Sequence, residues 1–147
     1  AGKRGTAMHN YLEYMVAGKN LLDLTEEGVE AQKMAEVVRD KGFGDLDEIW
    51  GSEVVLSYPG LYAGQTDLCG IYQGRESIID FKQSNKPKMV AYAMAHDAIH
   101  GTQIEQGVIL MCTPDLFFQK FVLNGSRFRQ YKWKWLWRLS EYYKNVH

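Results

Sequence analysis

The sequence predicts an α/β protein in which a mixed central β-sheet of about five strands is flanked by α-helices. Apolar residues recur at helical spacing at both ends of the chain and in one middle segment, and short apolar or alternating runs fill the intervals. Turns rich in glycine and proline separate these segments. The chain has 147 residues, of which 46% are hydrophobic and 24% charged, so we expect one domain spanning residues 1–147.

Two helices are predicted at the start of the chain. Thr6 is a candidate N-cap for the first, and helical spacing of apolar residues continues from there to Lys19-Asn20. The second helix is predicted to begin at Thr25, and its first turn is acidic, as the helix dipole favours. Gly42 ends this helix because glycine is a weak helix former.

Three strands are predicted next, at residues 53–58, 62–72 and 77–83. A Pro59-Gly60 turn separates the first two, and a short loop at residues 73–76 joins the second and third as a hairpin. The sequence therefore predicts that the second and third strands pair antiparallel.

The rest of the chain is predicted to form a helix, two strands and a last helix. Residues 89–100 form an Ala-rich helix, residues 106–112 an apolar strand inside the sheet, and residues 116–123 a fifth strand. Ser126 caps the long last helix. One face of that helix is apolar, with the residues Phe128, Tyr131, Trp135, Leu139 and Tyr142.

Charge and cysteine content exclude some classes of protein and leave others open. The net charge of −1 neither supports nor excludes nucleic-acid binding. Cys69 and Cys112 lie in apolar segments outside any C-x-x-C pair, so we expect buried thiols in a reducing compartment, not a zinc site. No apolar run is long enough to span a membrane and no signal peptide is evident. A bacterial or phage-infected cytoplasm and a mitochondrial matrix both fit.

Two aspartates and a lysine fall on adjacent strands of the predicted hairpin. Asp80 and Lys82 are two residues apart and so share one face of a strand, and counting back around the hairpin loop brings Asp67 near Asp80. Asp80 interrupts an apolar run, and a buried carboxylate is costly unless it is paired or binds a metal. Carboxylate oxygens suit Mg²⁺ or Mn²⁺, which can activate a water and polarise a phosphodiester.

Taken alone, Asp80-x-Lys82 is more simply explained as a solvated ion pair on an exposed strand. The Gly64-x-x-Asp67 motif at hairpin distance is what favours a metal site. In that interpretation Lys82 either stabilises the charge that develops on the phosphate or positions the nucleophilic water.

The ordered pair Gly64-x-x-Asp67 and Asp80-x-Lys82 resembles the PD-(D/E)xK nuclease superfamily, and more closely its RecB-type exonuclease branch. The segment ending in His9, Gly5-Thr6-Ala7-Met8-His9, resembles the G-x-x-x-H helix motif of that branch.

Two further segments extend the resemblance over nearly the whole chain. Glu53, which precedes the G-x-x-D strand, resembles an extra acidic residue of the branch. Residues 80–88, Asp-Phe-Lys-Gln-Ser-Asn-Lys-Pro-Lys, are similar to a stretch of mitochondrial genome maintenance exonucleases and related phage exonucleases.

The resemblance implies a restriction-endonuclease-like core and a metal-dependent nuclease site. Asp67 and Asp80 would bind Mg²⁺ or Mn²⁺, the backbone carbonyl of Phe81 would add a ligand, and Lys82 would be the catalytic lysine. His9 would be a ligand or lie beside one.

The resemblance also implies contacts around that site. Glu53 would support the ligands from behind or bind a second metal. Ser84, Lys86 and Lys88 would contact DNA phosphates.

One departure from the family pattern concerns the helix after D-x-K. The branch carries a Q-x-x-x-Y motif there, with a tyrosine at the DNA site. Tyr92 matches the tyrosine, whereas Lys88 occupies the glutamine position. The family has several more residues before this helix, so either the chain is short between Lys88 and Met89 or the sequence lacks a loop; we favour the second.

Other candidate residues receive simpler interpretations. His96 and His100 have i, i+4 spacing but no third ligand, so we expect both at the surface. In the last helix, some basic residues are expected to border a DNA groove while its apolar face packs inward.

The function expected from the sequence is hydrolysis of DNA phosphodiester bonds by a Mg²⁺- or Mn²⁺-dependent exonuclease acting on single-stranded DNA or free ends. The alternatives are a DNA-binding module on the same fold without turnover, and an endonuclease of the same superfamily.

Overall fold

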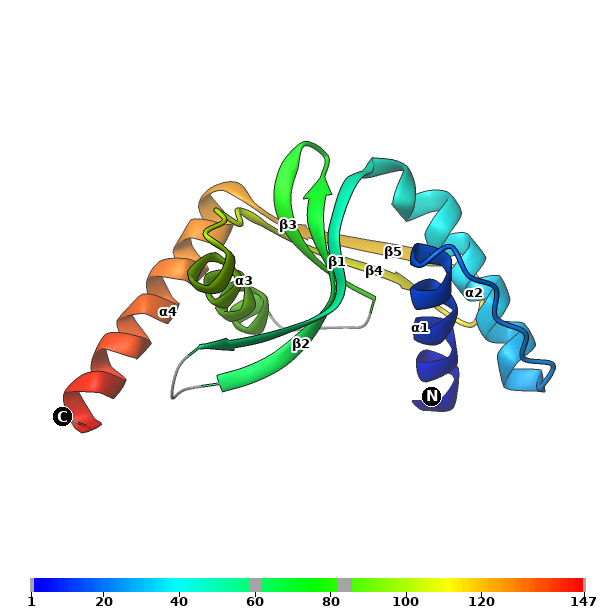
Figure 1. Cartoon of the computed structure of the whole chain (residues 1–147), viewed down its shortest axis with the longest axis horizontal. Coiled ribbons are helices and arrows are strands. Elements are labelled where there is room, and N and C mark those ends of the chain that lie inside the picture. Colours follow the sequence, from blue (N-terminus) through cyan, green and yellow to red (C-terminus); the bar gives the residue numbers. More distant parts are fainter. Residues whose placement is uncertain (1, 59–61, 82–85, 147) are drawn as a thin grey trace.

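A computed structural model describes the backbone of residues 2–58, 62–81 and 86–146, and the side chains of residues 7–52, 65–81 and 88–145. The elements follow the order α-α-β-β-β-α-β-β-α that the sequence predicts (Figure 1). They are α1 (Gly2–Val16), α2 (Glu26–Gly42), the 3-10 turn η1 (Phe43–Asp45), β1 (Leu46–Tyr58), β2 (Tyr62–Tyr72), β3 (Arg75–Asp80), α3 (Lys86–His100), β4 (Gln106–Cys112), β5 (Phe118–Leu123) and α4 (Gly125–Val146).

The strands form one five-stranded mixed sheet in the order β1-β2-β3-β4-β5. Strands β1, β2 and β3 pair antiparallel, as do β4 and β5. Among the described strands, the β3–β4 pair alone is parallel; a parallel pair requires a crossover, and α3 supplies it. The predicted α/β class with a mixed sheet between helices is therefore confirmed.

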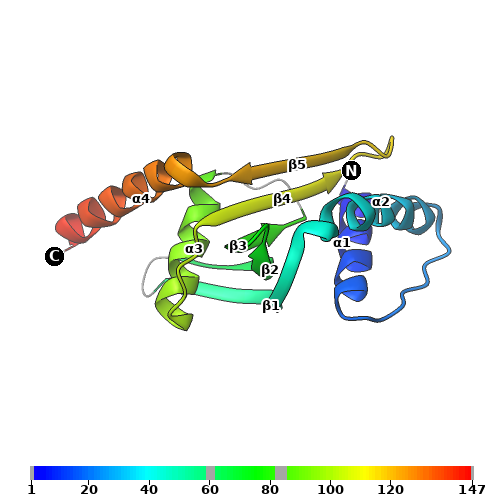
Figure 2. The same ribbon diagram turned by 90° about the horizontal axis from the view of Figure 1, so that it is seen from above.

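The helices cover the two faces of the sheet in pairs (Figures 1 and 2). Because side chains alternate along a strand, Leu68 of β2 joins a core cluster with residues of α1 and α2, such as Leu12 and Val38. Its neighbour Cys69 joins the opposite cluster, which includes Val90 of α3 and Phe128 of α4.

Local signals account for several element ends. The side chain of Thr25 accepts a hydrogen bond from the backbone N–H of Gly28 at 3.0 Å and caps α2, which begins at Glu26, one residue after the predicted start. Thr6, however, lies inside α1, which begins at Gly2, so its prediction as an N-cap was wrong.

Other element boundaries differ from those predicted by the local sequence pattern, and for β1 the reason is strand pairing. β1 begins at Leu46 instead of residue 53, since it pairs with β2 from Leu46↔Tyr72 onward across two bulges. β3 ends at Asp80 instead of residue 83, and α3 begins at Lys86, three residues earlier than predicted.

A buried polar network ties the sheet together at one end. The Gln106 side-chain amide donates to the backbone carbonyl of Tyr72 and to the hydroxyl of Ser77, both at 2.9 Å. Its own carbonyl accepts from Asn124 at 2.8 Å. Gln106 thus links β2, β3, β4 and the segment before α4, and its buried polar atoms are satisfied.

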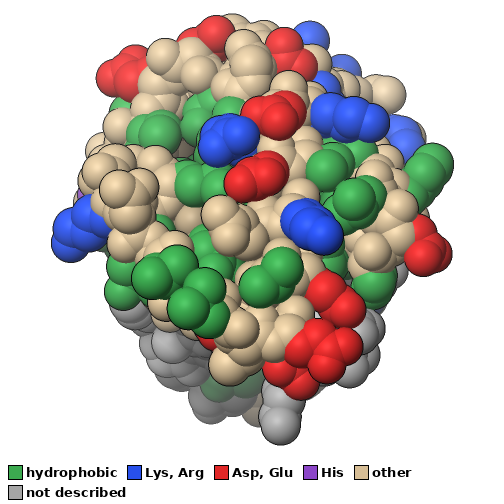
Figure 3. All heavy atoms as spheres, turned by 90° about the vertical axis from the view of Figure 1, so that its right-hand side faces the viewer, with side chains coloured by type: hydrophobic (Ala, Val, Ile, Leu, Met, Phe, Trp, Pro, Cys, Tyr) green, Lys and Arg blue, Asp and Glu red, His purple; other side chains and the backbone are tan. Residues whose placement is uncertain are grey.

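The surface over α1 and α2 is of mixed character. Acidic, basic and hydrophobic side chains are interspersed on the face that Figure 3 shows. Among the described helices, none is both long enough and apolar enough to cross a membrane.

Gly70 is predicted to be intolerant of any side chain. A methyl group there would overlap the backbone carbonyl oxygen of Glu48 on the neighbouring strand. Gly70→Ala should therefore lower the free energy of unfolding by roughly 1–3 kcal/mol, measured by urea denaturation. Gly44→Ala, where a methyl group meets nothing within 4 Å, is the control and should change it by less than about 0.5 kcal/mol. Equal effects of the two substitutions would contradict the prediction.

Candidate metal centre

Two buried aspartates meet where β2 and β3 pair. Leu68 lies opposite Ile79 in the register, so Asp67 and Asp80 follow as the next pair. The backbone N–H of Asp67 donates to Oδ1 of Asp80 at 3.2 Å, and the backbone N–H of Phe81 donates to Oδ2 of Asp67 at 2.8 Å. The structure thus brings together the two aspartates that hairpin counting places near each other.

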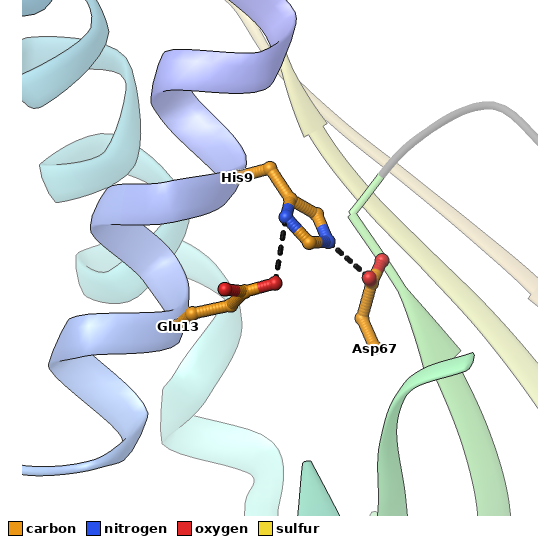
Figure 4. Close-up of side chains that lie close together, drawn as sticks. All are labelled: His9, Glu13 and Asp67. Carbon is orange, nitrogen blue, oxygen red and sulfur yellow. Dashed lines mark hydrogen bonds and ion pairs between the residues drawn. The ribbon is translucent and has the colours of Figure 1, made fainter. Parts of the chain in front are cut away.

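A histidine of α1 reaches the same corner from the other side. His9 Nε2 contacts Oδ1 of Asp67, and His9 Nδ1 lies 2.8 Å from a carboxylate oxygen of Glu13, one helical turn further on (Figure 4). The His9 ring also packs edge-on against buried Phe81, with ring centroids 6.2 Å apart. Packing and hydrogen bonding together fix the orientation of the imidazole.

The three side chains His9, Glu13 and Asp67 offer a ready set of metal ligands. One ligand atom from each lies within 4.8 Å of the others. A neutral imidazole that donates from Nδ1 to Glu13 has only a lone pair at Nε2, and that lone pair cannot bond to the acceptor-only carboxylate of Asp67. Either a second proton on the ring or a metal cation shared by Nε2 and Asp67 would resolve this conflict. The donor set therefore fits a divalent metal.

Glu13 is the member of this cluster that sequence reasoning missed. Its signal was the i, i+4 spacing from His9, which puts both side chains on one face of a helix. A carboxylate that holds the second nitrogen of a metal-binding histidine is a common arrangement in metal sites.

Cys69, two residues from Asp67, does not belong to the ligand set. Burial raises the pKa of its thiol to about 11, and the charge of Asp80 adds to the effect. The Cys69 side chain belongs to the core cluster beneath α3, and it is not among the residues that group around His9. Both cysteines are buried, as predicted.

Several predicted site residues lie partly or wholly outside the described residues. Lys82 and Ser84 are not described at all. Glu53 lies in β1 between the pairs Ser52↔Leu68 and Val54↔Thr66, at the level of Asp67, and Lys86 begins α3; the side chains of both are outside the described set.

Lys88 and Tyr92 share one face of α3, which runs without a break through Lys88 and Met89. The Lys88 ammonium lies 5.6 Å from the centre of the Tyr92 ring. Tyr92 is buried within the cluster beneath α3, whereas Lys88 is exposed. The ammonium group of Lys88 is therefore accessible to solvent, whereas the Tyr92 ring is not.

The expectation that His96 lies at the surface was wrong. Its side chain is only 4% exposed, bonds to the Thr102 hydroxyl at 2.7 Å and stacks against Trp50 of β1. Burial lowers the pKa of His96, and neighbouring His100 lowers it further. His100 is exposed, as expected. Both line a pocket of about 250 Å³ with Trp50 and Thr102.

Comparison with known proteins gives two sequence relatives. The chain is 28% identical over 155 residues to mitochondrial genome maintenance exonuclease 1 of Homo sapiens, and 32% identical over the same length to the Mus musculus protein of that name. Each match covers 95% of this chain but 45% of the relative, so the chain spans about half the length of the curated relatives. No family model matches the chain.

The fold also has a counterpart among solved structures. A crystal structure of a protein from Eubacterium rectale, provisionally named an exonuclease, aligns with a TM-score of 0.59 over 97% of this chain and 66% of that protein. Its sequence identity of 10% makes this a similarity of fold alone. Both sequence relatives are thus named exonucleases, and the solved structure shares the fold.

Metal binding is predicted to stabilise the folded chain through Asp67. A divalent ion that binds only the native state should raise the free energy of unfolding by about 2.7 kcal/mol at 100 times the Kd. The melting temperature should therefore be higher in MnCl₂ or MgCl₂ than in EDTA. Asp67→Ala should abolish this shift in a thermal-unfolding assay. Asp40→Ala removes an exposed carboxylate of α2 and should leave the shift intact. A full shift in the Asp67 variant would argue against the site.

Proposed function

We propose that this chain is a divalent-metal-dependent deoxyribonuclease that acts as an exonuclease on single-stranded DNA or free DNA ends. The observation that carries the proposal is the convergence of His9, Glu13 and Asp67 beside buried Asp80. The two sequence relatives, both named exonucleases, support the same function.

The proposed ligands are Asp67, Asp80 and Nε2 of His9, with the backbone carbonyl of Phe81 as a further candidate. A bound Mg²⁺ or Mn²⁺ polarises a phosphodiester and lowers the pKa of a coordinated water. The chain's own contribution is preorganisation. The Phe81 N–H holds Asp67, the Asp67 N–H holds Asp80, and Glu13 orients His9, so little rearrangement is needed when substrate arrives.

The roles proposed for five other residues rest on the sequence pattern. Lys82 would stabilise the developing charge on the phosphate, and Glu53 would support the ligands or bind a second metal. Ser84, Lys86 and Lys88 would contact the DNA backbone.

The proposed compartment is the cytoplasm of a bacterial or phage-infected cell, with the mitochondrial matrix as the alternative. The name of the sequence relatives favours the alternative, and two buried free thiols fit either compartment.

The nuclease activity is predicted to require both the metal and Lys82. End-labelled linear single-stranded DNA should be degraded in Mg²⁺ or Mn²⁺, remain intact in EDTA, and be degraded at least 100-fold more slowly by Lys82→Ala, since removing one donor from a charge-stabilising site costs about that much. Lys33→Ala on α2 is the matched control.

Circular single-stranded DNA tests whether ends are required, because only an endonuclease should cut it. A folded, metal-loaded wild type that binds DNA without degrading either substrate would refute the enzyme and favour a binding module.

Glu13 is predicted to act through His9. Glu13→Gln removes the carboxylate that holds Nδ1, and should weaken Mn²⁺ binding about 10- to 100-fold, measured by isothermal titration calorimetry. Glu27→Gln, an exposed change on α2, should bind Mn²⁺ as the wild type does. Unchanged affinity in Glu13→Gln would exclude a role for this residue at the metal.

A further inference from the structure

The outward side of α4 carries two exposed tryptophans. Trp133 is 71% and Trp137 66% exposed, and their i, i+4 spacing places them on one side of the helix about 6 Å apart along its axis. The opposite side of α4 packs inward through Phe128, which belongs to the core cluster beneath α3 and α4. Tryptophan is highly buried on average in folded proteins, so an exposed pair indicates a surface used for binding.

Positive charge is concentrated on the same helix. In a chain of net charge −1, α4 holds six Lys or Arg residues and one acidic residue, Glu141. The Glu141 carboxylate lies 3.7 Å from Lys144, one turn beyond the tryptophans. Arg129 and Lys134, both exposed, flank the tryptophan pair. We call Arg129, Trp133, Lys134 and Trp137 the α4 face.

A shallow basic pocket adjoins this face at the start of α4. It has a volume of about 180 Å³, and its lining includes three cationic side chains and one acidic one: Arg75, Arg129, Lys132 and Glu105. Arg129 belongs both to the pocket and to the α4 face. Cationic side chains therefore line the pocket and, through Arg129, continue to the exposed tryptophan rings.

The α4 face is remote from the metal centre. Helix α4 packs with α3 on one side of the sheet and extends beyond it, whereas α1, which carries His9, packs on the other side (Figures 1 and 2). The surface over α1 and α2 mixes both signs of charge (Figure 3), so the basic character of α4 is not a general property of the molecule.

We propose that the α4 face and its adjoining pocket bind single-stranded nucleic acid at a site separate from the metal centre. Exposed aromatic rings stack on unpaired bases, and interleaved cations neutralise the phosphates between them. Duplex DNA keeps its bases stacked inside and has no free faces for the rings. A protein interface is depleted of charge at its core, whereas here cations alternate with the rings.

The proposal rests on the proposed function in one respect, namely that the bound strand is the nuclease substrate. A strand held on α4 places a second part of the same molecule near the enzyme and raises the effective concentration of its end. Long single strands should therefore bind more tightly than short ones.

Binding of fluorescein-labelled oligo(dT) in EDTA, measured by anisotropy, tests the site without cleavage or metal. Trp133→Ala/Trp137→Ala should weaken binding at least tenfold, about 1.4 kcal/mol. Arg129→Ala/Lys134→Ala should reduce the slope of log K against log salt by about 1.4, since each phosphate contact on a single strand contributes about 0.7. Lys33→Ala/Lys41→Ala on α2 removes the same charge elsewhere and should leave affinity and slope near wild type.

Because the binding assay is run in EDTA, its outcomes test the α4 face independently of the nuclease assay. Both α4 variants should unfold at the wild-type temperature, because the replaced side chains are exposed. Wild-type affinity in both would overturn the proposal, as would a wild type that fails to bind oligo(dT). Sedimentation in which the wild type self-associates and the tryptophan variant does not would overturn it in favour of a second copy of the chain. Failure of the nuclease proposal would instead appear as binding without degradation in Mg²⁺.

Discussion

Two hydrogen bonds are the constraint on which the proposed site depends: the backbone N–H of Asp67 donates to the Asp80 carboxylate, and the backbone N–H of Phe81 donates to the Asp67 carboxylate. They join the middle of β2, at Asp67, to the end of β3, at Asp80, and they hold two carboxylates in a buried corner. Concentrating negative charge in such a place is costly unless a cation compensates it. The fold therefore accepts a local penalty that the proposed divalent metal would relieve, and buried interacting charges of this kind are typical of functional sites.

The rest of the architecture supports that corner. α1 packs against the sheet through Leu12 and so brings His9 onto Asp67. The parallel β3–β4 pair, made possible by the α3 crossover, places β3 inside the sheet where its last residue, Asp80, is buried. Helix α4 packs on the face of the sheet opposite α1, so the proposed strand-binding face and His9 lie on helices that cover opposite faces.

Where sequence reasoning failed, tertiary contacts decided. The local sequence pattern predicted that β1 begins at residue 53, but pairing with β2 extends this strand back to Leu46. Histidine is a polar residue type, yet Trp50 of β1 stacks on the His96 ring and the Thr102 hydroxyl forms a hydrogen bond with one of its ring nitrogens. Such environments are assembled from segments that are distant in the chain. Hydrophobic periodicity and secondary-structure propensity are local and cannot show them.

The sequence by itself determined the order of the elements, the mixed sheet between helices and the juxtaposition of Asp67 with Asp80, because hydrophobic period and hairpin counting are local properties. Only the tertiary structure decided that His9 of α1 meets Asp67 of β2 and that Trp133 and Trp137 stay outside the core. Both depend on how a helix is rotated against the sheet, and that rotation is set by the packing of whole faces and not by any single residue.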